Sequence, residues 1–270
     1  MILKDEGMSS RSRIRVGVTG TAATKTILPL LLTIVLTFAV LLAGQPIGVL
    51  LAVPAVYFWR RFVHRPWAGV GLPITWSAVP LLLIGSGVTV AALLAANAAS
   101  VAMGAARWVP WEPEDLIYLP LVIAIIIIAQ VFPEELIWRG NLYDLLAEHL
   151  SPRVVLVLTS VGFGALHVFS QSAARGIVEV VLYAVGAMAL GFVCAASRAR
   201  TGSIWMAIGV HSGFYFGNGF FPTEGIVYGV QLLVQIIVMV LIGLLVLGRA
   251  GSRTQAARPG VVTRKPDEGE

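Results

Sequence analysis

Apolar residues run along this chain in eight stretches, separated by short polar, proline-containing or glycine-containing breaks. A helix needs roughly 17–25 mainly apolar residues to cross a bilayer. The second and seventh stretches are shorter than that, while the third and fourth are long enough to tilt or to reach the interface. The pattern predicts an all-α, polytopic transmembrane bundle of about eight helices. The expected helices are Ile27–Gly44, Pro46–Trp59, Trp76–Ala105, Leu116–Glu148, Arg153–Phe169, Ile177–Ser197, Ile204–Asn218 and Ile226–Leu247.

Lysine and arginine positions predict the orientation of this bundle. If the N-terminus is cytoplasmic, 17 of the 19 basic residues fall on the inward-facing parts, and only Arg107 and Arg175 fall outside. Cytoplasmic loops are expected to carry this excess of positive charge. A seven-helix alternative would place one basic tail outside. We therefore expect both termini to be cytoplasmic.

The polar ends and the glycine pattern complete the predicted organisation. Residues 1–24 and 250–270 are expected to be disordered cytoplasmic tails, because they are rich in serine, glycine, proline and charge. Residues 25–249 form the predicted transmembrane domain, whose first helix is interpreted as a retained anchor rather than a cleaved signal. Gly209, Gly213 and Gly217 are spaced at i, i+4 and i+8, which predicts close approach of another helix.

Composition and charge narrow the class of protein. Hydrophobic residues make up 57% of the chain, charged residues only 12%, and the mean hydropathy is +0.87. A soluble domain carries about twice that charged fraction, so the composition argues against a water-soluble globular enzyme. The net charge of +5 does not indicate nucleic-acid binding, because the basic residues flank apolar runs instead of forming one basic face. The lipid bilayer is the expected partner.

Two adjacent carboxylates follow the apolar run of the fourth predicted helix. Glu134 and Glu135 come directly after Ile125–Pro133, and charge within a bilayer costs roughly 2.5–3.5 kcal/mol per group on insertion scales. Glu135 and Arg139 are spaced at i, i+4 and can form an ion pair. Glu134 is then unpaired by its own helix, which makes it a candidate general base. The alternative is a charge cluster at the cytoplasmic interface, where the cost is small.

Two histidines lie in other apolar helices. His167 follows Phe163 by one turn on the same helical face, and His211 lies in the seventh predicted helix. A single histidine in such a helix is commonly a hydrogen-bonded packing group. The expected directions of the three helices nevertheless allow both histidines and the glutamates to reach a similar depth. Glutamate and histidine together suit the activation of water, by a general base or through a bound metal.

These residues resemble the motifs of a known family. Glu134-Glu135-x-x-x-Arg139 followed by x-x-x-Tyr143, then Phe163-x-x-x-His167, then His211, are similar to the three motifs of the CPBP family. Its members are the CAAX-type and bacteriocin-processing intramembrane proteases, also called the Abi family. The resemblance covers roughly residues 116–218.

The resemblance implies a hydrolase of the bacterial cytoplasmic membrane that cleaves a membrane-associated or peptide substrate. It implies that Glu134 and His167 activate water, that Glu135 and Arg139 brace the first motif, and that His211 stabilises the oxyanion. Two mechanisms stay open. Glu134, His167 and His211 either ligate Zn²⁺, as in a metalloprotease, or work without metal, as in a glutamate protease.

One position departs from the family pattern. The third motif usually reads His-x-x-x-Asn, and Tyr215 stands where the asparagine is expected. Asn218 lies about 10.5 Å along the axis from His211, too far to replace that amide. Tyr215 either supplies the oxyanion donor through its hydroxyl or marks a non-catalytic scaffold or immunity-type member. A transporter with a polar relay is a third alternative, though the chain has no inverted repeat.

Overall fold

The structure is a computed structural model that describes residues 21–43, 47–110, 115–170, 172–225 and 227–248. The predicted C-terminal tail and residues 1–20 of the predicted N-terminal tail lie outside these ranges. Pro46, at the expected start of the second helix, also lies outside them.

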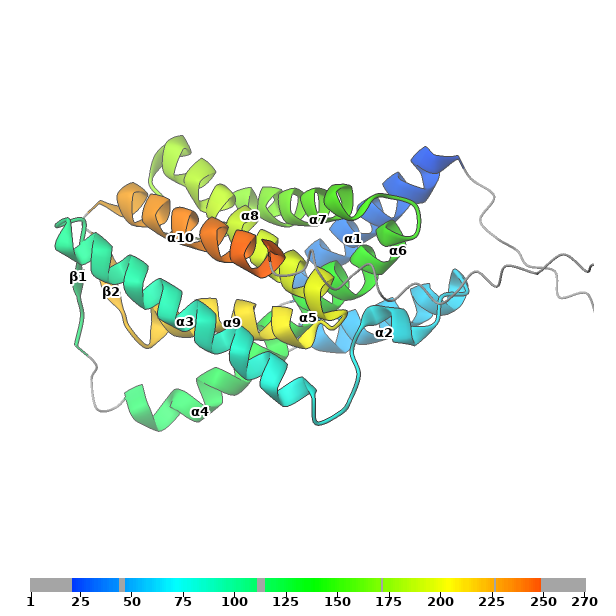
Figure 1. Ribbon diagram of the computed structural model, residues 1–270, viewed down its shortest axis with the longest axis horizontal. Coiled ribbons are helices and arrows are strands. Elements are labelled where there is room, and N and C mark those ends of the chain that lie inside the picture. Colours follow the sequence, from blue (N-terminus) through cyan, green and yellow to red (C-terminus); the bar gives the residue numbers. More distant parts are fainter. Residues whose placement is uncertain (1–20, 44–46, 111–114, 171, 226, 249–270) are drawn as a thin grey trace, which may run out of the picture.

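Eight helical segments make up the bundle within the described residues, and their bounds agree with the predicted ones to within a few residues. The segments are α1 (Ala22–Ala43), α2 (Ile47–Phe62), α3 (Ala78–Ala102), a long segment from Asp115 to Ala147, α7 (Pro152–Leu166), α8 (Gly176–Thr201), α9 (Trp205–Gly219) and α10 (Tyr228–Gly248). Figure 1 shows α3, α7, α8, α9 and α10 running roughly along the long axis of the molecule. The predicted all-α polytopic bundle is therefore confirmed.

Five of these segments are long and apolar enough to cross a bilayer. They are Ala78–Ala102, Ile117–Ala147, Pro152–Phe169, Gly176–Thr201 and Tyr228–Gly248. Helix α1 has a shorter apolar part, Thr24–Val40, and α2 and α9 span 16 and 15 residues. Large apolar side chains such as Leu83 and Leu245 are 62% and 68% exposed, as expected for helices that face lipid. The chain is a multi-pass membrane protein. The cytoplasmic position of both termini stays a prediction.

The long fourth segment alternates between α- and π-helix. It runs through α4 (Asp115–Ile125), the π-helix η2 (Ile126–Val131), α5 (Phe132–Glu135), the π-helix η3 (Leu136–Leu142) and α6 (Tyr143–Ala147). Within α5, Pro133 has no N–H to donate to the preceding turn, which loosens the α-helical ladder there. The N–H groups of Phe132 and Tyr143 bond to Ile127 and Trp138, five residues back. π-Turns of this kind are rare and are frequent at functional sites.

Helices α3 and α9 pack closely through the predicted glycine stripe. A Cβ on Gly209 would lie 2.2 Å from the carbonyl oxygen of Leu82, and one on Gly213 would lie 2.6 Å from that of Ser86. A Cβ on Gly217 would lie 2.8 Å from the Cβ of Leu93 on α3. The stripe therefore allows the backbones of α3 and α9 to touch, as predicted.

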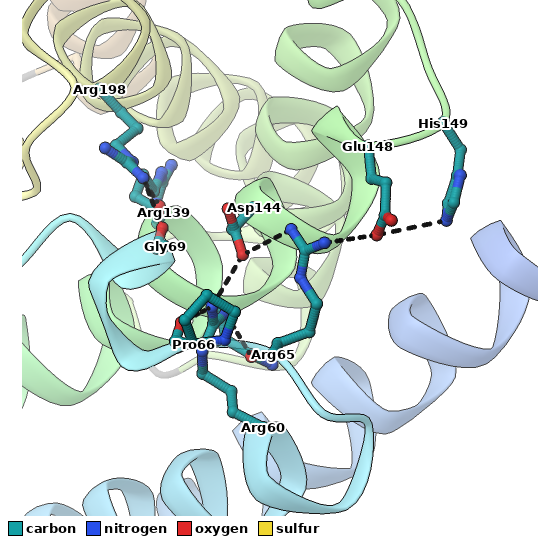
Figure 2. Close-up of polar contacts among 10 residues, drawn as sticks. Arg60, Arg65, Pro66, Gly69, Arg139, Asp144, Glu148, His149 and Arg198 are labelled. Carbon is teal, nitrogen blue, oxygen red and sulfur yellow. Dashed lines mark hydrogen bonds and ion pairs between the residues drawn. The ribbon is translucent and has the colours of Figure 1, made fainter. Parts of the chain in front are cut away.

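A cluster of charged residues joins α2 to the end of the long segment, and we call Arg60, Arg65, Asp144 and Glu148 the basic-end cluster (Figure 2). Arg60 is only 1% exposed and donates to Oδ2 of Asp144 at 2.8 Å. Arg65 donates to the same oxygen at 3.1 Å and to Glu148 at 2.7 Å. Each carboxylate of the cluster has an arginine partner.

The loop after α2 is fixed by an arginine of α8. This loop holds the 3₁₀ turn η1 (Trp67–Val70), and Arg198 donates to the Gly69 carbonyl at 2.7 Å and to the Arg139 carbonyl at 3.1 Å (Figure 2). Gly71 has a φ of +71°, and a Cβ there would lie 2.3 Å from the Arg198 guanidinium. The side chain of Val70 is fully buried. The loop therefore closes this end of the bundle over the long segment.

A short sheet at the opposite end was not predicted. Strand β1 (Ala106–Trp108) pairs antiparallel with β2 (Thr223–Gly225), and Arg107 forms an ion pair with Glu224. Each strand has only three residues, too few for an alternating pattern to be visible in the sequence.

Candidate active site

A cavity of about 540 Å³ lies between α1, α2, the long fourth segment, α7, α8 and α9. Its polar wall includes Glu134, His167 and Tyr215, which the sequence singled out, and Gln130 and Tyr183, which it did not. Its apolar wall includes Phe38, Trp138, Phe163 and Phe169. The cavity is therefore large, mainly apolar and polar at a few positions, as is usual for ligand sites.

Behind this wall, the carboxylate of Glu135 is held by the guanidinium of Arg139 and the imidazole of His211. Its Oε1 accepts from Nη1 of Arg139 at 3.0 Å and lies 2.8 Å from Nδ1 of His211. Both Glu135 and Arg139 are 0% exposed, and His211 is 2% exposed. The alternative of an interfacial charge cluster therefore does not hold for Glu135 and Arg139. They form the predicted i, i+4 pair inside the bundle.

Arg139 makes two further contacts, one to α8 and one to α7. Its Nη2 donates to the Gly191 carbonyl of α8 at 3.0 Å, and a Cβ on Gly191 would lie 2.9 Å from the same nitrogen. The guanidinium carbon also stacks over the Phe163 ring at 4.4 Å. These contacts connect the long segment to α7 and α8 and hold the carboxylate of Glu135 in one place.

Glu134 differs from its neighbour in both partners and position. Gln130 donates to its Oε1 from the preceding turn, so the expectation that its own helix leaves Glu134 unpaired was wrong for this oxygen. Its Oε2 is buried, has no hydrogen-bond partner among the described residues, and lies 3.9 Å from Nε2 of His211. Glu134 thus lines the cavity and keeps one carboxylate oxygen without a hydrogen-bond partner among the described residues.

His167 ends α7 and begins the 3₁₀ turn η4 (His167–Phe169). Its Nδ1 lies 2.9 Å from the Phe163 carbonyl oxygen, and its ring lies 4.7 Å from the Phe163 ring. Because a carbonyl only accepts, Nδ1 carries the proton and Nε2 carries the lone pair in the neutral ring. His167 therefore has a free nitrogen to accept a hydrogen bond at the cavity wall.

His211 and Tyr215 lie one turn apart on α9 with stacked rings. Their centroids are 5.6 Å apart at an interplanar angle of 15°. With the Nδ1 proton directed at Glu135, the Nε2 of His211 accepts in the neutral ring and donates only in the imidazolium form. Tyr215 forms a side-chain hydrogen bond with Gln130. Its hydroxyl group is thus joined through Gln130 to Glu134.

Sequence reasoning missed Gln130 and Tyr183. A polar amide in the run Ile125–Val131, one turn before Glu134, was a visible signal for Gln130. Tyr183 lies on α8 with its ring 6.2 Å from that of His167. No spacing rule connects α8 to the other motifs, so only the folded chain brings Tyr183 to the site.

The predicted zinc ligands do not gather as a metal site. Among the described residues, no three side chains of histidine, cysteine, aspartate or glutamate are placed to hold one metal ion. His211 directs Nδ1 to Glu135, which is the orientation that second-sphere carboxylates give to metal-bound histidines. Glu134, His167 and His211 as placed nevertheless do not fit Zn²⁺ as a three-ligand set.

Residues 116–217 match the family model described as type II CAAX prenyl endopeptidase Rce1-like. This match confirms the predicted resemblance to the CPBP family, over the segment that carries its three motifs. It supports the general activity of a CAAX-type intramembrane protease. No curated protein matches the chain in sequence.

Proposed function

We propose, from the premise that residues 116–217 are Rce1-like, that this chain is an intramembrane endopeptidase that hydrolyses a peptide bond of a membrane-associated or peptide substrate. The observation that carries this proposal is that Glu134, whose buried Oε2 has no hydrogen-bond partner among the described residues, lines a cavity that His167 also lines. A carboxylate and an imidazole with free acceptor atoms are suited to bind and deprotonate water.

In the proposed reaction, water lies between Glu134 and Nε2 of His167. Glu134 takes one proton from the water, and the resulting hydroxide attacks the peptide carbonyl. The carbonyl oxygen becomes an oxyanion that accepts from the Tyr215 hydroxyl and from His211 in its imidazolium form. As the C–N bond breaks, the proton passes from Glu134 to the leaving nitrogen. Glu135 and Arg139 take no proton and hold His211 in place.

The aromatic walls of the cavity are suited to bind an apolar group of the substrate. Phe38 of α1 and Phe169 of η4 form a T-shaped pair at 5.8 Å on the cavity wall, and the ring of Trp138 lies 5.7 Å from that of Phe163. The name of the matched family indicates a prenylated C-terminal peptide, whereas a bacterial membrane location indicates processing of other peptides. Both classes of substrate bring an apolar group next to the bond that is cut.

The test is cleavage of fluorogenic peptides, with and without a farnesyl group, by the purified full chain in liposomes. Glu134→Gln and His167→Ala are expected to lower turnover by about 10²–10⁴-fold, the usual contribution of a general base. Glu148→Gln, which changes a carboxylate outside the cavity, is the matched control and keeps full turnover. Unchanged cleavage in Glu134→Gln contradicts the proposal.

A second candidate function is a non-catalytic scaffold or immunity-type role, which the tyrosine at position 215 favours. It predicts that Glu134→Gln keeps the cellular phenotype and that wild-type protein cleaves no peptide. Tyr215→Asn restores the family residue. If only this variant cleaves, the natural chain is a non-catalytic member.

Metal use is tested separately. A metal-free mechanism predicts that dialysis against 1,10-phenanthroline leaves turnover unchanged and that the purified chain contains less than one zinc per molecule. Loss of turnover that added Zn²⁺ restores would instead establish a metalloprotease.

A further inference from the structure

A second, smaller cavity adjoins the large one at Tyr215. It has a volume of about 70 Å³ between the end of α7 and helices α8, α9 and α10. Its polar wall consists of His167, Tyr183, His211, Tyr215 and Gln235. Leu190, Phe214 and Met239 are among its apolar walls. We call it the rear chamber.

The rear chamber shares part of its wall with the large cavity. His167, Tyr183 and Tyr215 line both, whereas His211 and Gln235 line only the chamber. A water molecule needs roughly 10–15 Å³ of such space and two to four polar partners. The chamber meets both requirements and is in contact with both histidines of the proposed reaction.

Gln235 is built into the chamber by a cluster of buried amides. Its Nε2 donates to Oδ1 of Asn97 and to Oδ1 of Asn218, each at 2.9 Å. Gln231, one turn earlier on α10, donates to the same oxygen of Asn97 at 3.3 Å and to the Thr223 hydroxyl at 2.5 Å. Asn97 is 0% exposed, and Gln231 and Gln235 are 7% and 8% exposed.

The two glutamines are therefore similar in burial and in their bond to Asn97, but only Gln235 lines the chamber. An amide within a bilayer is costly unless it is hydrogen-bonded, so Gln235 can serve to hold α3, α9 and α10 together, and Gln231 can serve to hold α3, β2 and α10 together. That role alone does not explain why Gln235 lies beside the histidines. Comparing Gln231 with Gln235 therefore separates a packing role from a role at the site.

We propose that the rear chamber is a water site that supplies the hydrolytic water to Glu134 and His167. The inference rests on the proposed endopeptidase function. Each cycle of hydrolysis consumes one water molecule, and an apolar substrate that fills the large cavity excludes bulk water from it. Water held in the chamber lies beside His167, Tyr183 and Tyr215, which also line the large cavity. Gln235 anchors this water and is a positioning residue, since it contacts no reacting atom.

The experiment compares Gln235→Leu with Gln231→Leu in the full chain in liposomes, measuring kcat, KM and thermal unfolding. Both variants remove one amide bond to Asn97, so similar shifts in Tm are expected. Gln235→Leu is expected to lower kcat about tenfold with KM unchanged, because it replaces a polar wall of the water site with an apolar one. Gln231→Leu keeps kcat. Gln235→Asn, which retains an amide, is expected to recover most of the turnover.

Three results would overturn the inference. Equal losses of kcat in Gln235→Leu and Gln231→Leu would show that the cluster acts through packing alone. A normal kcat in Gln235→Leu would show that the chamber supplies no water. A raised KM, with altered preference among peptides of different side chains, would make the chamber a pocket for a substrate side chain. Full cleavage by Glu134→Gln would instead contradict the endopeptidase function itself, whatever Gln235→Leu does.

Discussion

The long fourth segment contributes to two clusters of charge that are built differently. In the basic-end cluster, Asp144 and Glu148 face Arg60 and Arg65, so arginines and carboxylates are equal in number. At the candidate active site there are two carboxylates, Glu134 and Glu135, and one guanidinium, that of Arg139. The guanidinium pairs with Glu135.

This difference separates a structural cluster from a reactive one. At the basic end, each carboxylate has an arginine partner and the cluster closes the loop after α2. At the site, Glu134 has no arginine partner: Gln130 donates to its Oε1, and its Oε2 has no hydrogen-bond partner among the described residues and lies 3.9 Å from Nε2 of His211. A buried carboxylate without an arginine partner is costly, so the fold bears this cost at the position where the proposed chemistry needs a base.

The largest effect is expected from removing the one arginine of the site. Arg139→Met leaves Glu135 buried beside Glu134 without its ion-pair partner, and breaking a buried pair typically costs about 3–5 kcal/mol. Thermal unfolding in detergent is the measurement, and the Tm is expected to fall steeply together with activity. A stable, active Arg139→Met would show that the site does not depend on the pair.

The next largest effect is expected from Tyr215→Phe. It removes only the hydroxyl, and loss of one oxyanion donor typically lowers kcat by about 10²–10³-fold. Ring stacking on His211 is kept, so the Tm is expected to change little. Single-turnover cleavage measures the effect, and full activity would exclude the hydroxyl as a donor.

Gln130→Met is expected to have a smaller effect on turnover. The change keeps the length of the side chain but removes the donor to Glu134 and the bond to Tyr215. A hydrogen bond to a charged group contributes about 1.5–3 kcal/mol, so kcat is expected to fall about ten- to a hundredfold with KM unchanged. An unchanged kcat would mean that Gln130 does not position the base.

The smallest effect is expected from Arg65→Met in the basic-end cluster. The Arg65 side chain is 25% exposed, and its partner Glu148 is 45% exposed. Partly exposed pairs contribute about 0.2–1 kcal/mol, so a small fall in Tm with full turnover is expected. If Arg65→Met abolished cleavage, the separation of the two clusters would be wrong.

The sequence predicted the helices because long apolar runs specify membrane spans directly. It predicted the polar site residues because polar groups in such runs are conspicuous. These residues are Glu134, Glu135, Arg139, His167 and His211. Proximity between Tyr215 and the glutamate motif followed only from the family resemblance.

Other features depend on contacts that no local pattern reveals. The two π-turns lie on either side of α5, where Pro133 interrupts the hydrogen-bond ladder. Most proline-containing helices continue as α-helix, so the type of turn could not be foreseen. Tyr183 reaches the site through the packing of α8 against α7 and α9, and Gln235 reaches it through the packing of α10 against α8 and α3. The buried contacts of Arg198 likewise required the folded loop.

The most direct test of this account is turnover and Tm measured in parallel for Glu134→Gln and Glu135→Gln. The two variants make the same chemical change at adjacent positions of the chain. We predict that Glu134→Gln loses cleavage and keeps its Tm, whereas Glu135→Gln lowers the Tm because it weakens the contacts to Arg139 and His211. The reverse pattern, with cleavage retained in Glu134→Gln, would contradict the division into a reactive and a bracing glutamate.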